Sequence, residues 1–390
     1  MDGFIASRVR ELHPSGIRAV MTLAAERQAR GLPVIHMEVG QPDFTTPEHI
    51  VEAAFSAVKN GCTGYTPNAG FMSLREAVAE RVAQKTGAEI SGKNICITTG
   101  GVMAIYLSLM SFVEPGDEVL VPDPGWPNYL NAISMAGGKS IPYALHFDKN
   151  YQPDIDELQD KITSKTRAIF INYPGNPTGA NLSVDKMKKL LDFAERNNIL
   201  LISDEIYEDF IFEGAHVSAL SNALGPDPLN RVIMISGASK SYAMTGWRIG
   251  WMVANEATIN AATRLVESIV SCPPAVSQAA AEAAVRGSQD CVKTMCQAYK
   301  RRSALAASIL EPDGFLLNKP QGAFYAMVDI SKAEKSSNDF VRELLENTGV
   351  AVAPGETFGS LTKSSVRIST AISDKDVIVG CRQIRDYLNQ

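Results

Sequence analysis

Near the start of the chain, apolar residues recur three or four positions apart, which predicts two helices that each have one apolar face. Ser15 is placed to cap the first helix, which Gly31 stops. Thr46 and Pro47 open the second helix in the favoured order of cap then proline, and Gly61 ends it. The apolar residues of the two faces are Ile17, Val20, Met21 and Ala24, then Ile50, Val51, Ala54, Phe55 and Val58.

From residue 95 onward the pattern changes to short continuous apolar runs, mostly of β-branched residues, bounded by turn residues. The runs cover 95–98, 118–121, 168–172, 199–203, 232–236 and 249–253. Helical patterns separate several of them, notably 102–112 and 184–197. Continuous apolar strands with helices between them are typical of a mostly parallel sheet that is buried on both faces. The predicted fold class is therefore α/β, and ligands of such sheets bind at the carboxyl ends of the strands.

Length and composition agree with a soluble enzyme of two domains. The chain has 390 residues, of which 45% are hydrophobic and 21% are charged, so it has ample material for a core. Its net charge of −6 is not the positive charge that is typical of nucleic-acid-binding proteins. It contains neither a run of about 18 apolar residues nor an apolar segment typical of a secretion signal. We therefore expect a cytoplasmic protein that binds neither nucleic acid nor a membrane.

Cysteines and histidines predict no metal site. The six cysteines show no paired CxxC spacing, and the closest two, Cys291 and Cys296, lie in a helical-looking stretch, so free thiols in a reducing compartment are expected. The histidines show no HExxH or similar spacing and are interpreted as structural or solvated. They stand at positions 13, 36, 49, 146 and 216.

Residues with useful chemistry follow the predicted strands. They lie at 100–101, 122–129, 172–179, 204–207 and 239–248. Each signal is weak alone, because a Gly-Gly turn more often serves packing, a lone lysine is usually solvated and a lone aspartate usually caps a helix. Together they bring phosphate donors, an amine, a carboxylate, a phenol, an amide and an indole to one crevice. This set suits pyridoxal 5′-phosphate, whose aldehyde, ring nitrogen, phenolic oxygen and phosphate need such partners.

At these residues the sequence resembles the class I/II aminotransferases, which are pyridoxal-phosphate enzymes of fold type I related to aspartate aminotransferase. The motifs, in order, are VGQPDF at 39–44, NYPGNPTG at 172–179, SDEIY at 203–207, SKSYAMTGWRIG at 239–250 and VRIS at 366–369. Their order and spacing match the family over nearly the whole chain. The resemblance implies a large cofactor domain at 48–285 and a smaller α/β domain formed by both termini. The smaller domain comprises 1–47 and 286–390.

The resemblance implies that Lys240 forms the Schiff base with the cofactor and then moves the proton between the substrate Cα and the cofactor. Asp204 pairs with the ring nitrogen, which relieves the cost of a carboxylate at the end of a buried strand. Tyr207 and Asn176 bind the phenolic oxygen. Trp126 stacks on the ring, and Trp126 and Asn176 also border the substrate.

The phosphate is expected at the start of a helix, where the backbone amides of Gly101 and Val102 and the helix dipole favour an anion. Ser239 adds a hydroxyl and Arg248 a charge-assisted fork. Tyr65, by resemblance, reaches the phosphate of the neighbouring subunit. The resemblance thus implies a homodimer whose active sites lie at the interface.

The substrate is expected to bind through its α-carboxylate to Arg367, a bidentate match for that anion, with the Gly40 backbone nearby. Some relatives that take acidic substrates carry a lysine where Val102 stands, and many members of the family carry a bulky residue where Gly125 stands. An apolar and roomier pocket favours neutral or aromatic side chains. Arg18, on the helix after Ser15, could restore a cation, so acidic substrates stay open.

The expected activity is transfer of an amino group between an amino acid and a 2-oxo acid. The same scaffold also supports lyase, cyclase and decarboxylase chemistry, and the motifs do not separate these reactions. A ligand-sensing regulator is a hypothesis of a different class. It needs an attached DNA-binding module, and we expect none, because no residues precede the helix at Ser15 to build one.

Overall fold

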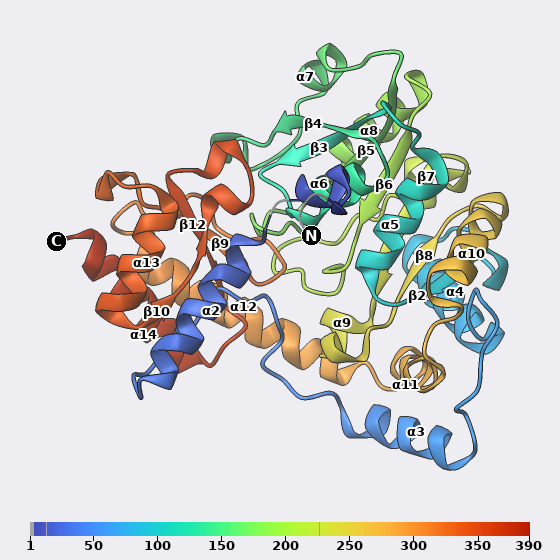
Figure 1. Ribbon diagram of the computed structural model, residues 1–390, viewed down its shortest axis with the longest axis horizontal. Helices are drawn as coiled ribbons and strands as arrows, with labels where there is room; N and C mark the ends of the chain where they lie inside the picture. The colour runs from blue at the N-terminus through green and yellow to red at the C-terminus, as the bar shows by residue number, and fades with distance from the viewer. Residues whose placement is uncertain (1–3, 13, 226) are drawn as a thin grey trace.

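A seven-stranded, mostly parallel sheet lies at the centre of the structure, a computed structural model that describes residues 4–12, 14–225 and 227–390 (Figure 1). The strand order is β2-β8-β7-β6-β5-β3-β4, and β8 runs antiparallel to both of its neighbours. The strands are β2 (Ile95–Thr98), β3 (Glu118–Asp123), β4 (Lys139–Ala144), β5 (Thr166–Asn172), β6 (Leu200–Asp204), β7 (Val232–Gly237) and β8 (Gly250–Val253). The predicted α/β fold with a mixed, mostly parallel sheet is confirmed.

Successive residues of a strand point to opposite faces of the sheet, and in these strands the residues on both faces are apolar. Helices therefore cover both faces. One face packs Val121, Phe170 and Ile235 against α5, α6 and α10. The other packs Leu120 and Ile171 against α4, α7, α8 and α11, with α3 next to α11. These helices are α3 (Glu48–Lys59), α4 (Met72–Thr86), α5 (Gly101–Phe112), α6 (Asn128–Met135), α7 (Ile155–Asp160), α8 (Val184–Arg196), α10 (Glu256–Val270) and α11 (Ala275–Arg286). The short helix α9 (Ala238–Ser241) follows β7 directly.

Both ends of the chain share a second core, seen at the left of Figure 1. Strand β1 (Ile35–His36) pairs in parallel with β10 (Val350–Ala351), and β11 (Ala353–Pro354), β12 (Ser365–Ser369) and β9 (Tyr325–Asp329) form an antiparallel sheet. The helices here are α2 (Gly16–Ala29), α12 (Asp290–Leu310), α13 (Ser337–Thr348) and α14 (Asp374–Leu388), whereas the short helix α1 (Ser7–Arg10) lies against α6. The domain boundaries at residues 48 and 285 stay a prediction.

The local predictions are confirmed in most places and wrong in a few. Ser15 Oγ accepts a hydrogen bond from Arg18 N at 3.4 Å, as expected of a cap. Thr46 does not cap α3: its hydroxyl donates to Ala243 O at 2.8 Å instead. Phe55 is 64% exposed although it belongs to the predicted apolar face of α3. Strand β4 was not expected, because its lysine, serine and proline suit only the edge of the sheet where it lies.

The described residues lack what a membrane-spanning helix, a metal site or a disulfide would require. Among the described residues, none of the helices is long and apolar enough to cross a membrane. Within the same ranges, no three His, Cys, Asp or Glu side chains gather as a metal site would require, and His13 lies outside the described residues. The cysteines are free thiols. The expectations of a cytoplasmic location and of no nucleic-acid partner stay predictions.

Arg302, on α12, joins the segment that leads to the predicted site to the C-terminal helix. It is 7% exposed, and its Nη1 and Nη2 donate to the two oxygens of Asp43 at 2.8 and 2.9 Å. Its Nε donates to Asp374 Oδ1 at 3.0 Å. The rings of Phe44 and Tyr299 lie 5.5 and 5.7 Å from its guanidinium carbon. One buried cation therefore holds two carboxylates and two rings in place.

We expect Arg302→Ala to lower the free energy of unfolding by about 2–3 kcal/mol, because it leaves Asp43 without its bidentate partner in a partly buried place. Arg301→Ala is the matched control: it removes an exposed partner of the same Asp374 and should cost less than about 1 kcal/mol. Denaturant unfolding measures both. Equal losses would contradict the central place given to Arg302.

Candidate active site

A cavity of about 380 Å³ lies where the carboxyl ends of β3, β5, β6 and β7 meet β12. The structure brings together there every predicted site residue except Tyr65. The residues that line the cavity include Gly40, Gly101, Val102, Trp126, Asn176, Asp204, Tyr207, Ser239, Lys240, Arg248 and Arg367. The topology explains this convergence, because parallel strands end at one edge and their following residues face the same space.

Lys240 lies on α9, directly after β7, and its side chain lines the cavity, where the amine contacts the backbone of Gly40. Its Nζ donates to Gly40 O at 2.7 Å. Loss of water around the amine, and the nearby positive charges of Arg367 and Arg248, lower the pKa of Lys240 to about 8. A larger fraction of the amine is thus neutral near pH 7 than in an ordinary lysine. Such an amine can attack a carbonyl group or take up a proton.

Asp204 ends β6 and is 5% exposed. Its Oδ2 accepts a hydrogen bond from Tyr129 OH at 2.7 Å, and its Oδ1 accepts one from Ile206 N at 3.2 Å. Burial raises the pKa of Asp204 to about 6, even though both hydrogen bonds act in the opposite direction. A cation placed against this carboxylate would restore the charge balance. Tyr129 lies in the 122–129 segment that the sequence analysis singled out, but its role became visible only with its partner.

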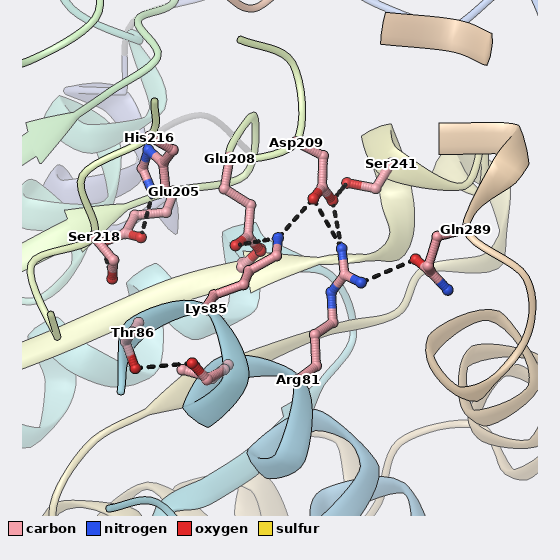
Figure 2. Close-up of polar contacts among 12 residues, drawn as sticks. Arg81, Lys85, Thr86, Glu205, Glu208, Asp209, His216, Ser218, Ser241 and Gln289 are labelled. Carbon is pink, nitrogen blue, oxygen red and sulfur yellow. Dashed lines mark hydrogen bonds and ion pairs between the residues drawn. The ribbon is translucent and has the colours of Figure 1, made fainter. Parts of the chain in front are cut away.

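The neighbouring Glu205 cannot substitute for Asp204, because its carboxylate is already paired outside the cavity. His216 Nε2 lies 2.7 Å from Glu205 Oε2 (Figure 2). Ala219 N donates to Glu205 Oε1 at 3.0 Å. Although burial opposes it, His216 lowers the pKa of the Glu205 carboxyl. Two adjacent buried carboxylates therefore have separate functions: Glu205 is structurally satisfied, and Asp204 is available to a ligand.

Tyr207 faces the cavity three residues after Asp204, as the spacing predicted. Its hydroxyl lies 2.8 Å from the hydroxyl of Tyr325, a residue that the sequence analysis did not identify. Burial and the neighbouring Tyr325 hold the pKa of Tyr207 well above its usual value, so the phenol keeps its proton at neutral pH. It is therefore available as a hydrogen-bond donor.

Arg367, on β12, is a buried cation whose partners leave room for an anion. Its Nη1 donates to Asn176 Oδ1 at 3.0 Å, and its Nη2 donates to Glu38 O. Its Nε has no partner among the described residues. The rings of Tyr325 and Phe358 lie 4.4 and 4.9 Å from the guanidinium carbon. A carboxylate would complete the hydrogen bonds of this guanidinium.

The start of α5 and Arg248 form a site suited to a phosphate. Gly100 has φ of +87°, and a Cβ at this position would lie 2.5 Å from Arg248 Nη2, so the close approach requires glycine. The backbone at Gly101 and Val102 then opens a helix of 12 residues, whose free amides favour an anion. Arg248 itself is held by a hydrogen bond from Nη1 to Thr245 O at 2.8 Å. Ser239 borders the same cavity.

Tyr65, expected to reach a neighbouring subunit, lies outside the cavity of its own chain, and that role stays a prediction. Tyr65 is 93% exposed in the segment between α3 and α4 and does not line the cavity. Gly125 does not line it either. A Cβ at this position would lie 2.4 Å from Pro122 O, so the glycine allows the backbone to turn closely past Pro122. The idea that Gly125 enlarges the pocket is therefore wrong. By contrast, Ile17 and Arg18 do border the cavity, as expected.

A partly buried polar cluster outside the cavity fixes the segments that carry Tyr207 and Lys240 (Figure 2). Its members are Arg81, Lys85, Glu208, Asp209, Ser236, Ser241 and Gln289. Lys85 Nζ donates to Glu208 Oε2 at 2.8 Å and to Asp209 Oδ1 at 2.6 Å. Ser241 Oγ donates to Asp209 Oδ2 at 2.5 Å. The residue after Tyr207 and the residue after Lys240 are thus tied to one ion-paired network.

Comparisons with known proteins agree along the whole chain. Residues 33–384 match the family model described as aminotransferase class I and II. The chain is similar to the aspartate aminotransferase of Pyrococcus horikoshii, with 39% identity over 389 residues, or 99% of this chain and 97% of that protein. It is 36% identical to aromatic-amino-acid aminotransferase 2 of Thermococcus litoralis over 370 residues, 94% of each. The crystal structure of aspartate aminotransferase from Thermotoga maritima aligns with a TM-score of 0.93 at 32% identity, covering 99% of this chain and 100% of that one.

We predict that Tyr129→Phe raises the pKa of Asp204 further, by about 0.5–1 unit, because it removes a hydrogen bond that favours the ionised carboxyl. A pH titration of the Asp204 carboxyl signal in ¹³C-labelled protein measures it. Tyr143→Phe is the control, because Tyr143 is equally buried but donates to Phe170 O. If Tyr129→Phe left the Asp204 titration unchanged, or if both variants shifted it equally, the hydrogen bond would not have the effect assigned to it.

Proposed function

The chain belongs to the class I and II aminotransferases, and on that premise we propose that it moves an amino group between an amino acid and a 2-oxo acid through pyridoxal 5′-phosphate held by Lys240. One observation carries the proposal. The amine of Lys240, the carboxylate of Asp204, the phenol of Tyr207 and the guanidinium of Arg367 share one cavity. Amino donors with neutral or aromatic side chains are favoured.

The donor set fits this cofactor group by group. Lys240 would hold the aldehyde through its amine, and Asp204, whose burial leaves it in need of a cation, would face the ring nitrogen. The start of α5, Ser239 and Arg248 would hold the phosphate, and Trp126 would stack on the ring. When bound, pyridoxal phosphate supplies an electron-withdrawing ring that stabilises the negative charge left at the substrate Cα.

Lys240 is the residue that handles the proton. Its amine, with a pKa lowered to about 8 by burial and by neighbouring cations, can take the proton from the substrate Cα and hold it within the cavity. The hydrogen bond from Nζ to Gly40 O, and the positive charge of Arg367 that acts on this amine, support that role. Tyr207, which keeps its proton, would donate to the phenolic oxygen, and Asn176 would bind beside it.

Arg367 would bind and orient the substrate by its α-carboxylate. The guanidinium is flanked by two rings and anchored by Asn176, and its Nε has no partner among the described residues, so it is held in place with hydrogen-bonding capacity left for the anion. Gly40 would line the path of that carboxylate. Binding by two fixed groups, Arg367 and Lys240, would hold the Cα next to the base that acts on it.

We also propose a homodimer in which Tyr65 reaches the phosphate site of the partner. The side chain of Tyr65 is 93% exposed and has no part in the cavity of its own chain. Phe55 on the preceding helix is 64% exposed, although it lies on the apolar face that the sequence pattern predicts to be packed. A second chain over this surface would give both residues a function.

The side-chain preference rests on the apolar residues that border the cavity. Ile17, Val102 and Ile105 line it, whereas Arg18 is the cation that could attract an acidic side chain. The named relatives include both aspartate and aromatic aminotransferases, so their names do not decide the matter. The larger share of apolar lining favours neutral or aromatic donors.

Lys240→Ala should abolish the absorbance of lysine-bound cofactor and lower turnover by at least about 10³-fold, because no other group replaces the base. Lys93→Ala, a change at an exposed lysine outside the cavity, should leave both intact. In the wild type, the rate of cofactor capture should rise with pH through about 8, since the neutral amine is the nucleophile.

The reaction type is read from products. The loaded enzyme given single amino acids without a 2-oxo acid should release the matching 2-oxo acid and leave pyridoxamine phosphate. Release of ammonia or carbon dioxide would point to lyase or decarboxylase chemistry instead. Wild-type turnover by Lys240→Ala would overturn the assignment of that residue.

Arg18→Ala should change the KM for neutral and aromatic amino acids by less than about threefold, because these side chains offer no charge to pair with it. Arg30→Ala, at the far end of the same helix and paired with Glu346, is the control. Steady-state kinetics with a panel of amino acids measure the effect. A wild type that prefers aspartate or glutamate, and an Arg18→Ala variant that alone loses that preference by about tenfold, would refute the proposed side-chain preference.

A further inference from the structure

Tyr325 touches both the cofactor half and the substrate half of the proposed site. It begins β9, is 2% exposed and lines the cavity. Its hydroxyl lies 2.8 Å from the hydroxyl of Tyr207, and its ring lies 4.4 Å from the guanidinium carbon of Arg367. One side chain therefore contacts the residue proposed to bind the phenolic oxygen and the residue proposed to bind the substrate carboxylate.

Packing fixes the position of this ring. The ring of Tyr207 meets it edge-on at a centroid distance of 5.6 Å, and the ring of Phe324 lies at 4.8 Å. The main chain at Gly40 passes directly against the hydroxyl: a Cβ there would lie 1.8 Å from Tyr325 Oη and 2.7 Å from the adjoining ring carbon. Pairing of β9 with β12 places Met327 opposite Arg367, which sets the register between the two residues.

Counting protons gives the hydrogen bond between the two tyrosines a direction. Each phenol carries one proton, so each can donate once. If Tyr207 donates to an oxygen in the cavity, it cannot also donate to Tyr325, and the 2.8 Å contact then requires Tyr325 to be the donor. A hydroxyl that accepts a hydrogen bond also becomes a better donor.

We propose that Tyr325 is a positioning residue: its hydroxyl donates to Tyr207 and thereby directs the Tyr207 proton toward the phenolic oxygen of the cofactor, while its ring holds Arg367 for the substrate carboxylate. The inference rests on the proposed function, because it presupposes a cofactor oxygen next to Tyr207. It adds that a single residue links cofactor binding to substrate binding.

The structure provides a matched control for each half of the role. Phe358 lies against the same guanidinium at 4.9 Å but has no hydroxyl. Tyr325→Phe removes only the hydroxyl, Phe358→Leu removes only a ring from Arg367, and Tyr325→Leu removes both the hydroxyl and a ring. Three variants thus separate the hydrogen bond from the stacking.

The experiment uses the protein loaded with pyridoxal phosphate and two readouts. One is the pH midpoint of the absorbance change of the bound cofactor, with the dissociation constant of pyridoxal phosphate as a companion. The other is the KM for the best amino acid. Hydrogen bonding to the charged phenolic oxygen favours the form that has lost its proton, so a weaker donor at Tyr207 raises the midpoint.

Tyr325→Phe should raise the midpoint by about 0.5–1 pH unit, the effect of one hydrogen bond, and keep the KM within about twofold. Phe358→Leu should raise the KM by about 3- to 30-fold and leave the midpoint in place. Tyr325→Leu should change both. A variant that only destabilised the fold would change the midpoint and the KM together. Changes in one readout without the other therefore distinguish the proposed role from a loss of stability.

The inference is overturned if Tyr325→Phe leaves the midpoint unchanged, or if Tyr325→Phe and Phe358→Leu change the two readouts in the same proportion. These outcomes leave the proposed function standing as long as the wild type binds pyridoxal phosphate through Lys240. A wild type that does not bind it would overturn the proposed function, and the inference with it.

Discussion

The cavity is lined by more basic than acidic side chains, and the chemistry of the site depends on that imbalance. Among the described residues that line it, Arg18, Lys240, Arg248 and Arg367 are basic, whereas Asp204 is the acid. Arg367 is buried, whereas Arg18 and Arg248 are exposed, and the excess of positive charge around the cavity attracts anions. A phosphate at the start of α5 and a carboxylate at Arg367 would supply them. Burial, together with the positive charges of Arg367 and Arg248, lowers the pKa of Lys240, which makes its amine reactive.

The rest of the fold holds these charges in place. Strands β6 and β7 end side by side and deliver Asp204 and Lys240, and the polar cluster ties Glu208, which follows Tyr207, and Ser241, which follows Lys240, to a network with α4. That cluster carries two cations and two carboxylates, so its own charges balance and none is left to compete for a ligand. Arg302 performs a similar task at the other side, where it anchors the 41–44 segment that begins next to Gly40.

The sequence predicts this site well where function depends on the residue itself and poorly where it depends on a partner. The apolar runs located six of the seven central strands, and every site residue taken from the sequence except Tyr65 lines the cavity. Tyr129 and Tyr325 were missed because a tyrosine acquires its role only from the group it meets, here Asp204 and Tyr207, over a hundred positions away for Tyr325. Thr46 and Gly125 were misjudged for the same reason: their contacts, to Ala243 and Pro122, are set by tertiary structure.

The central claim is that this excess of positive charge serves one phosphate-bearing aldehyde held by Lys240. The most direct test treats the protein with pyridoxal phosphate, reduces it with borohydride and maps the modified peptide by mass spectrometry, with inorganic phosphate as a competitor. The account predicts one modified lysine per chain, Lys240, and slower modification as phosphate is added. Modification spread over surface lysines, or a rate at Lys240 that phosphate does not affect, would contradict it.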